Sequence, residues 1–126
     1  MEILASRVLI RPADLEESLR FYRDALGLAV YREFPGGVVF FAGQGLIEVS
    51  GSSSAPATPA TQLWLQVRSL GQARARLAEY AVRVLRGAER EPWGLDEMWI
   101  ADPDGRRIVL VEVPEDHPMR RDTRWD

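Results

Sequence analysis

The sequence predicts an α+β fold of two βαβββ modules, whose eight strands form a curved mixed sheet around a cavity. The main observation is an internal repeat. Residues 7–15 and 62–70 each run from an alternating stretch into a helix-capping residue and a leucine, at a constant offset of 55 residues. A unit this short cannot bury its own apolar face, so both copies are expected to pack as one domain over residues 1–113.

Module one is expected over residues 3–50. It begins with an alternating strand at 3–11. Asp14, with Glu17 three residues later, forms a capping-box pattern that starts a helix, and Gly27 is suited to end it. The apolar face of this helix comprises Leu15, Leu19, Tyr22 and Leu26. Glycine-containing turns then separate three short strands, expected near 28–34, 37–42 and 45–50.

Module two is expected over residues 62–113, after a linker at 51–61 that is flexible by composition. A strand at 62–68 leads to Ser69, which caps a helix carrying Leu70, Ala73 and Leu77. Three further strands are expected near 82–86, 96–101 and 106–113. The polar tail at 114–126 is expected to be poorly ordered unless a partner holds it.

Composition excludes several classes of protein. The net charge of −3 argues against nucleic-acid binding, and no apolar run is long enough to span a membrane. With no cysteine there is no disulfide and no thiolate site, and all 16 basic residues are arginine, which excludes lysine chemistry. The N-terminus lacks a signal-peptide pattern, so we expect a cytoplasmic protein. The single histidine, His117, is expected to be solvated in the tail.

Alternation along the strands assigns side chains to two faces of the sheet. The face toward the helices is expected to carry Val8, Ile10, Ile47, Val49, Leu63, Leu65, Val67, Met98, Ile100, Ile108 and Leu110. The opposite face is expected to carry the candidate ligand-binding residues, which are Arg7, Arg11, Phe40, Glu48, Gln62, Trp64, Gln66 and Trp99. Two tryptophans among charged groups are typical of a small-molecule site, and also of a dimer interface. Both interpretations stay open.

Three stretches resemble a known family. Residues 13–28 resemble its helix pattern D-L-x-x-S-x-x-F-Y-x-x-x-L-G-L, while residues 92–94 and 102–108 resemble its P-W-G and D-P-D-G-x-x-I ending. The family is the vicinal-oxygen-chelate superfamily, which includes glyoxalase I, bleomycin-resistance proteins, fosfomycin-resistance enzymes and extradiol dioxygenases. The resemblance covers roughly residues 3–113 and implies the fold. It does not specify the activity, because one fold hosts many functions.

The resemblance also implies where a metal would be held. In metal-dependent members four ligands come from matching strand positions, which here are Arg7, Glu48, Gln62 and Val109. Arginine has no lone pair to give and valine has no donor atom, so we expect no family-type metal centre and no cofactor. In the family fold the first and fourth strands of a module lie side by side. We therefore expect Arg7 to pair with Glu48 and to take the space of the metal.

Three functions remain in competition. The preferred one is a metal-free binding protein of the bleomycin-resistance type, in which aromatic walls hold a small aromatic molecule, with drug or antibiotic sequestration as its use. The alternative is an enzyme, either metal-dependent with an atypical ligand set or using Glu48 as a general base. The third is an interaction module without a small ligand. We expect a homodimer with no nucleic-acid or membrane partner.

Overall fold

The computed structural model describes residues 1–119, which form two compact units. The first contains Met1–Ala57 with Pro103–Gly105, and the second contains Thr58–Asp102 and the chain from Arg106 onward. Each unit has the order strand, helix, three strands, as the repeat predicts. Hydrogen bonding divides the eight strands into two four-stranded sheets rather than one continuous sheet. The curvature and the enclosed cavity stay predictions.

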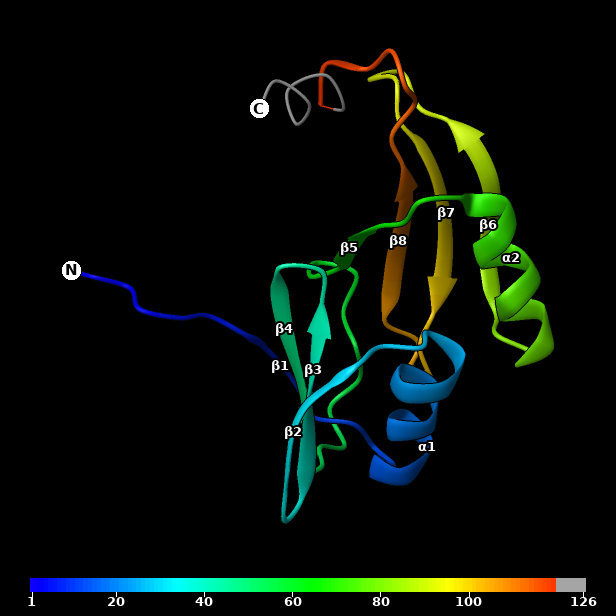
Figure 1. Cartoon of the computed structure of the whole chain (residues 1–126). Helices are drawn as coiled ribbons and strands as arrows, with labels where there is room; N and C mark the ends of the chain where they lie inside the picture. Colours follow the sequence, from blue (N-terminus) through cyan, green and yellow to red (C-terminus); the bar gives the residue numbers. More distant parts are fainter. Residues whose placement is uncertain (120–126) are drawn as a thin grey trace. The chain divides into compact units, whose positions relative to one another are not determined.

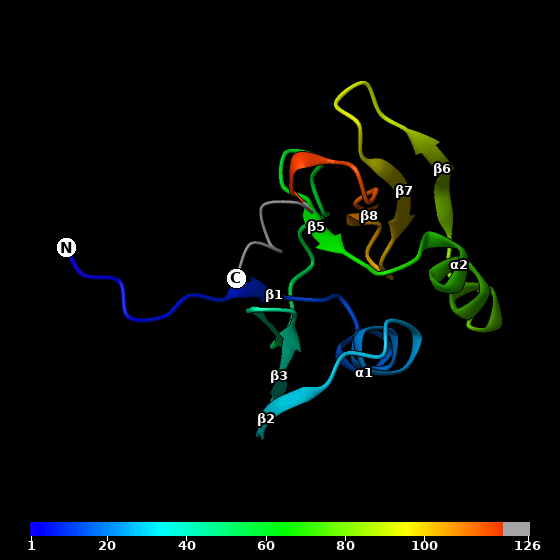
Figure 2. The same cartoon turned by 45° about the horizontal axis from the view of Figure 1, so that its top comes forward.

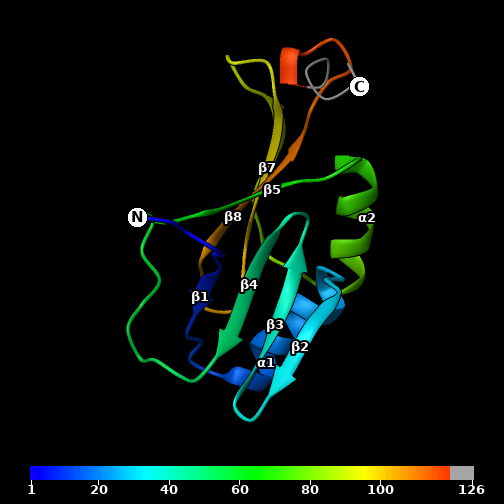
Figure 3. The same ribbon diagram turned by 60° about the vertical axis from the view of Figure 1, so that its left-hand side comes forward.

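The first unit has strands in the order β1-β4-β3-β2, with helix α1 on one face (Figures 2 and 3). The elements are β1 (Val8–Ile10), α1 (Leu15–Arg20), η1 (Phe21–Ala25), β2 (Val30–Phe34), β3 (Gly37–Ala42) and β4 (Gly45–Ser50). As expected, β1 and β4 are parallel neighbours, and Leu9 is paired with Glu48. The first strand is much shorter than the predicted 3–11, and Val8, expected against the helix, is exposed.

The first helix begins as predicted and then widens. The Asp14 side chain accepts a hydrogen bond from the Glu17 backbone N–H. After Arg20 the chain forms a π-helical turn, η1, instead of a continuous α-helix. This turn buries both Phe21 and Tyr22. Periodicity alone predicted only the second of these aromatic residues in the core.

The second unit has strands in the order β5-β8-β7-β6, and helix α2 packs against β7 and β8 (Figure 1). The elements are β5 (Leu63–Gln66), α2 (Leu70–Glu79), β6 (Val84–Arg90), β7 (Asp96–Ala101) and β8 (Arg107–Glu112). Ser69 caps α2 by accepting a hydrogen bond from the Gln72 N–H. The predicted helix-side residues Leu63, Met98, Ile100, Ile108 and Leu110 are all buried.

The segments outside the modules differ from expectation at one point. Residues 51–61 contain no helix or strand. His117, expected to be solvated, is half-buried against Gly94, whose added Cβ would lie 3.0 Å from the imidazole. Its Nε2 lies 3.1 Å from the Trp93 carbonyl oxygen, and its Nδ1 accepts a hydrogen bond from the Met119 N–H. Backbone groups of a turn therefore hold the histidine, a contact that composition does not reveal. The end of the predicted tail, 120–126, lies outside the described residues.

Candidate functional site

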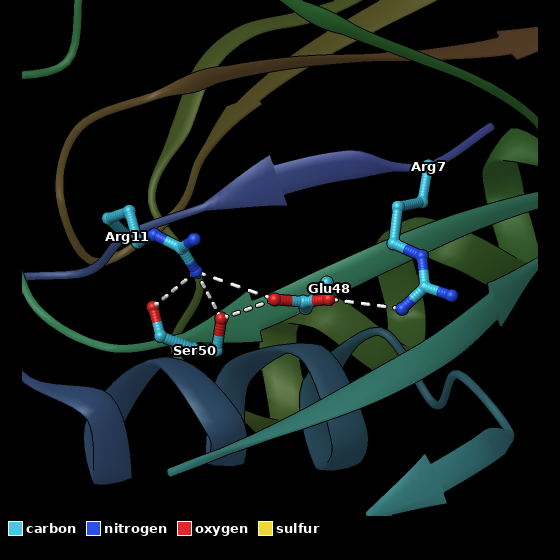
Figure 4. A network of polar contacts seen from close by, with 4 residues as sticks. All are labelled: Arg7, Arg11, Glu48 and Ser50. Atoms are coloured by element: carbon cyan, nitrogen blue, oxygen red, sulfur yellow. Dashed lines mark hydrogen bonds and ion pairs between the residues drawn. The ribbon is translucent and has the colours of Figure 1, made fainter.

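The first unit centres its polar residues on one carboxylate, Glu48 of β4 (Figure 4). Arg7 donates to Oε1 at 3.0 Å, and Arg11 donates to Oε2 at 3.4 Å. The Ser50 hydroxyl donates to the same Oε2 at 2.7 Å and accepts a hydrogen bond from Arg11. The predicted pairing of Arg7 with Glu48 is therefore confirmed. Both carboxylate oxygens are already engaged by groups of the protein.

These contacts affect the protonation of Glu48. The hydrogen bond from Ser50 and those from Arg7 and Arg11 lower the pKa of the Glu48 carboxyl from its usual value, although burial opposes them. The Glu48 side chain is 14% exposed, whereas those of Arg7 and Arg11 are 35% and 47% exposed. A carboxylate with a lowered pKa is a weak general base at neutral pH. This argues against the metal-free enzyme alternative.

The four positions implied as metal ligands do not fit a metal. Arg7 presents a cation to Glu48, and the amide nitrogen of Gln62 donates to the Pro59 carbonyl oxygen at 3.2 Å. Val109 is only 8% exposed and belongs to an apolar cluster. Within residues 1–119, no three His, Cys, Asp or Glu side chains come together as a potential metal site. The chemistry of this donor set, with one carboxylate already bound by two cations, does not suit a divalent ion.

The second unit centres on Trp99 of β7. Its ring packs against an apolar cluster comprising Leu95, Val109, Val111 and Val113. The guanidinium carbons of Arg86 and Arg107 lie 3.9 and 4.5 Å from the centre of the Trp99 ring. Guanidinium groups are attracted to the negative face of an indole, so Trp99 positions both arginines. The ring faces that were expected to stack a ligand are therefore engaged, at least in part, by the protein's own cations.

The two arginines differ in their acidic partners. Arg86 lies 2.8 Å from Glu89 and 2.5 Å from Glu91, and it donates to the Glu97 carbonyl oxygen at 3.1 Å. Arg107 has no carboxylate within ion-pairing distance among residues 1–119, and its buried Nε has no hydrogen-bond partner there. The indole nitrogen of Trp99 is likewise buried without a partner in this part of the chain.

The residues predicted for the site on β5 and directly before it are accessible. Trp64 is 48% exposed, and both Gln62 and Gln66 are exposed. Trp64 is paired with Val109, which is in turn paired with Trp99. The two predicted tryptophans therefore lie on one face of this sheet, separated by a single strand.

Phe40 corrects the predicted face. It is fully buried, its partner across the sheet is the core residue Ile47, and its ring lies 6.5 Å from that of Tyr22 in η1. Phe40 is thus part of the core on the helix side and cannot form a wall of a site on the opposite face. Its neighbour Phe41, which is 44% exposed, points the other way. Five consecutive apolar residues, Val38–Ala42, hid the alternation in the sequence.

Three polar residues near the predicted site were missed as functional candidates. Alternation places Ser50 and Arg107 on the predicted face, but no sequence motif indicates their contacts with Glu48 and Trp99. Arg86 was placed at the end of a shorter strand. Irregular pairing between Val84 and Arg86 shifts the register there, so simple alternation does not identify its face.

The chain matches a known protein family over most of its length. A family described as "Glyoxalase/Bleomycin resistance protein/Dioxygenase superfamily" matches residues 5–110. Comparison with curated proteins returned no match. No helix among residues 1–119 is long and apolar enough to cross a bilayer.

Solved structures resemble the chain over most of its length. A protein of unknown function from Agrobacterium tumefaciens is 24% identical with a TM-score of 0.74, covering 90% of this chain and 95% of that one. A glyoxalase-related enzyme from Fulvimarina pelagi is 22% identical with a TM-score of 0.73, covering 90% of each chain. A superfamily member from Sphaerobacter thermophilus is 24% identical with a TM-score of 0.70, covering 88% of this chain and 98% of that one. At these identities the likeness establishes the fold alone.

Proposed function

Because the chain belongs to the glyoxalase/bleomycin resistance protein/dioxygenase superfamily, we propose that it binds a small aromatic molecule without a family-type metal centre. The observation that carries the proposal is that groups of the protein already bind both carboxylate oxygens of Glu48. Its two oxygens accept hydrogen bonds from Arg7, Arg11 and Ser50. A metal ion would have to displace at least one guanidinium and would gain no donor from Val109.

The proposed ligand contacts lie on the sheet faces away from the helices. Trp64 supplies an accessible ring, while Gln62 and Gln66 supply exposed amide groups. Arg7 and Arg11 retain exposed guanidinium surface although they hold Glu48. Aromatic surface with a few polar groups is typical of small-molecule sites. Trp99 contributes by holding Arg86 and Arg107, and sequestration of a drug or antibiotic is the use that we propose.

The first experiment measures the metal content of the purified protein by elemental analysis. Tryptophan fluorescence is recorded with and without added Mg²⁺, Mn²⁺, Ni²⁺ and Zn²⁺. We expect far less than one metal ion per chain and no fluorescence response. A near-stoichiometric metal would overturn the metal-free proposal, and the metal-dependent enzyme alternative would then take its place.

Binding itself is tested with a panel of flat aromatic compounds, followed by tryptophan fluorescence. Trp64→Phe should remove most of the ligand-induced change, whereas Trp93→Phe should preserve it. Trp93 is the matched control because it is also exposed, at 58% against 48% for Trp64, and its indole nitrogen donates to Glu97. Equal loss in both variants would contradict a ligand contact at Trp64.

We also propose a cytoplasmic homodimer. The edge strand β1 exposes apolar side chains on both of its faces, with Val8 at 44% and Leu9 at 53%. Such a strand is normally covered in a stable protein. Light scattering coupled to size-exclusion chromatography should give twice the mass of the chain, and Leu9→Arg should shift the protein toward monomer. If Trp64→Ala dissociates the dimer and leaves ligand binding intact, the interface interpretation of this tryptophan is correct.

A further inference from the structure

We propose that the second unit selects aromatic carboxylates, with Arg107 binding the carboxylate and Trp64 stacking on the ring. This inference rests on the proposed function and names its ligand class. It concerns residues of one sheet alone, on the face opposite α2. Three features of this face support it: the unpaired charge of Arg107, its position beside Trp64, and nearby carboxylates that oppose a dianion more than a monoanion.

Neighbouring arginines of this unit differ in whether they have an acidic partner. Arg86 has two acidic partners, and Arg106 lies 2.6 Å from the Asp102 carboxylate. Arg107 has neither an ion pair nor a side-chain hydrogen bond within residues 1–119, and its guanidinium lies over the Trp99 ring. A half-buried guanidinium without an ion pair carries an unmet demand for an acceptor, which a ligand can supply to its terminal nitrogens. The indole holds this group in place, so it loses little freedom on binding.

The register of the sheet places Arg107 close to Trp64. Trp64 is paired with Val109, and Arg107 is two residues before Val109 on β8, on the same face. From the strand spacing and the rise per residue, the Cα atoms of Trp64 and Arg107 are about 8 Å apart. This separation matches a planar molecule whose ring lies over Trp64 and whose carboxylate reaches Arg107. Val109, directly across from Trp64 and two residues after Arg107, is apolar and offers no competing polar group.

Nearby carboxylates limit the charge of the ligand. Three carboxylates lie on the β6 side of the same sheet: Glu89 and Glu91 beside Arg86, and Glu97, which accepts from the Trp93 indole at 2.9 Å. Their field opposes any anion, and it opposes a doubly charged one, such as a phosphate monoester, about twice as strongly as a single carboxylate. One unpaired guanidinium matches one carboxylate, which it can bind through two parallel hydrogen bonds. A ring is needed as well, because the exposed indole contributes through stacking.

Isothermal titration calorimetry tests the proposal with four probes: 2-naphthoate, 2-naphthamide, 2-naphthylmethylammonium and acetate. The wild-type chain should bind 2-naphthoate about 10- to 100-fold more tightly than 2-naphthamide, and it should not bind acetate measurably. Arg107→Gln should remove this preference, and Arg107→Lys should retain part of it. Arg76→Gln is the matched control, because Arg76 also lies over an aromatic ring, 5.6 Å from the centre of Tyr80, but on α2.

The outcomes separate this inference from the proposed function. Equal affinity for the naphthoate and the amide, or a preference unchanged by Arg107→Gln, overturns the carboxylate inference while aromatic binding stands. Preference for the ammonium probe has the same consequence. If none of the ring-containing probes binds, the inference fails, and the proposed function loses its support unless another member of the aromatic panel binds. The comparison of carboxylate with amide on the wild-type chain keeps the test valid if the Arg107 variants fold poorly.

Discussion

In each of the two sheets, one row of paired residues crosses all four strands at equivalent positions, but the side chains of the two rows differ in chemistry. In the first unit the paired residues across the sheet are Leu9, Glu48, Val39 and Arg32. In the second unit they are Trp64, Val109, Trp99 and Arg86. Both rows end in an arginine that follows a break in register, after Val30 in one unit and after Val84 in the other. The backbone repeat therefore extends to the strand register and its break, whereas the side chains differ between the two units.

The difference lies in how each row satisfies its charges. Glu48 is surrounded by two guanidiniums and a hydroxyl, so the first row closes a polar network around a carboxylate. At the equivalent place, Val109 packs in an apolar cluster with Trp99 above it. The arginines of the second unit are held by an indole face rather than by this position. Equivalent places in a repeated fold thus share geometry without sharing a function.

The largest expected effect on stability comes from placing a carboxylate at Val109, the position in the second unit that is equivalent to Glu48. Val109→Asp should lower the free energy of unfolding by about 3–5 kcal/mol, because the charge would be buried in an apolar cluster without a built partner. Urea denaturation measures this loss. Val109→Thr, which keeps the shape, should cost about 1–3 kcal/mol. A Val109→Asp protein as stable as the wild type would mean that a neighbouring arginine accepts the charge and that the two rows are interchangeable.

A smaller effect on stability is expected from removing the negative charge of Glu48 in the first unit. Glu48→Gln should lower the free energy of unfolding by about 1–2 kcal/mol at pH 7, less than for a fully buried pair, because Arg7 and Arg11 are 35% and 47% exposed. The pKa of Glu48 is lowered in the folded state, so its contribution is present above the unfolded pKa of about 4.3. It is lost as the pH falls through the folded pKa.

The measurement is urea denaturation of both proteins between pH 7 and pH 3. The difference in stability between wild type and Glu48→Gln should shrink as the pH falls below about 4.3. Glu89→Gln, which removes a largely exposed partner of Arg86, is a charge-matched control from the second unit. A difference that stays constant down to pH 3 would contradict the assigned ionic role of Glu48.

The smallest effect is expected at Ser50. Ser50→Ala removes the hydroxyl that donates to Glu48 and accepts from Arg11, and it should cost about 0.5–1.5 kcal/mol. The Glu48 pKa should rise, since the Ser50 hydrogen bond is the largest influence that lowers it. Titration of the carboxyl carbon by nuclear magnetic resonance measures this rise. An unchanged pKa would show that the two arginines alone hold the carboxylate. Larger substitutions are unsuitable, because the Ser50 Cβ lies against Gly37.

Local rules predicted much of the fold. The repeat, the caps at Asp14 and Ser69 and the order of helices and strands along the chain were predicted because each depends on neighbours in the chain or on equivalent positions. The pairing of Arg7 with Glu48 followed from adjacent parallel strands, once the family resemblance supplied their order. The ligand-binding roles of these residues, and the homodimer, stay predictions.

The sequence by itself determined the two modules, their helix starts and most of the helix-side core, because periodicity and capping are short-range properties. Only the tertiary structure decided which way Phe40 points, since a run of apolar residues has no alternation to follow. It also decided that Trp99 holds two arginines and that Arg107 is left without an acid among residues 1–119. Those outcomes depend on register and on packing between strands that are distant in the chain, where small shifts exchange one neighbour for another.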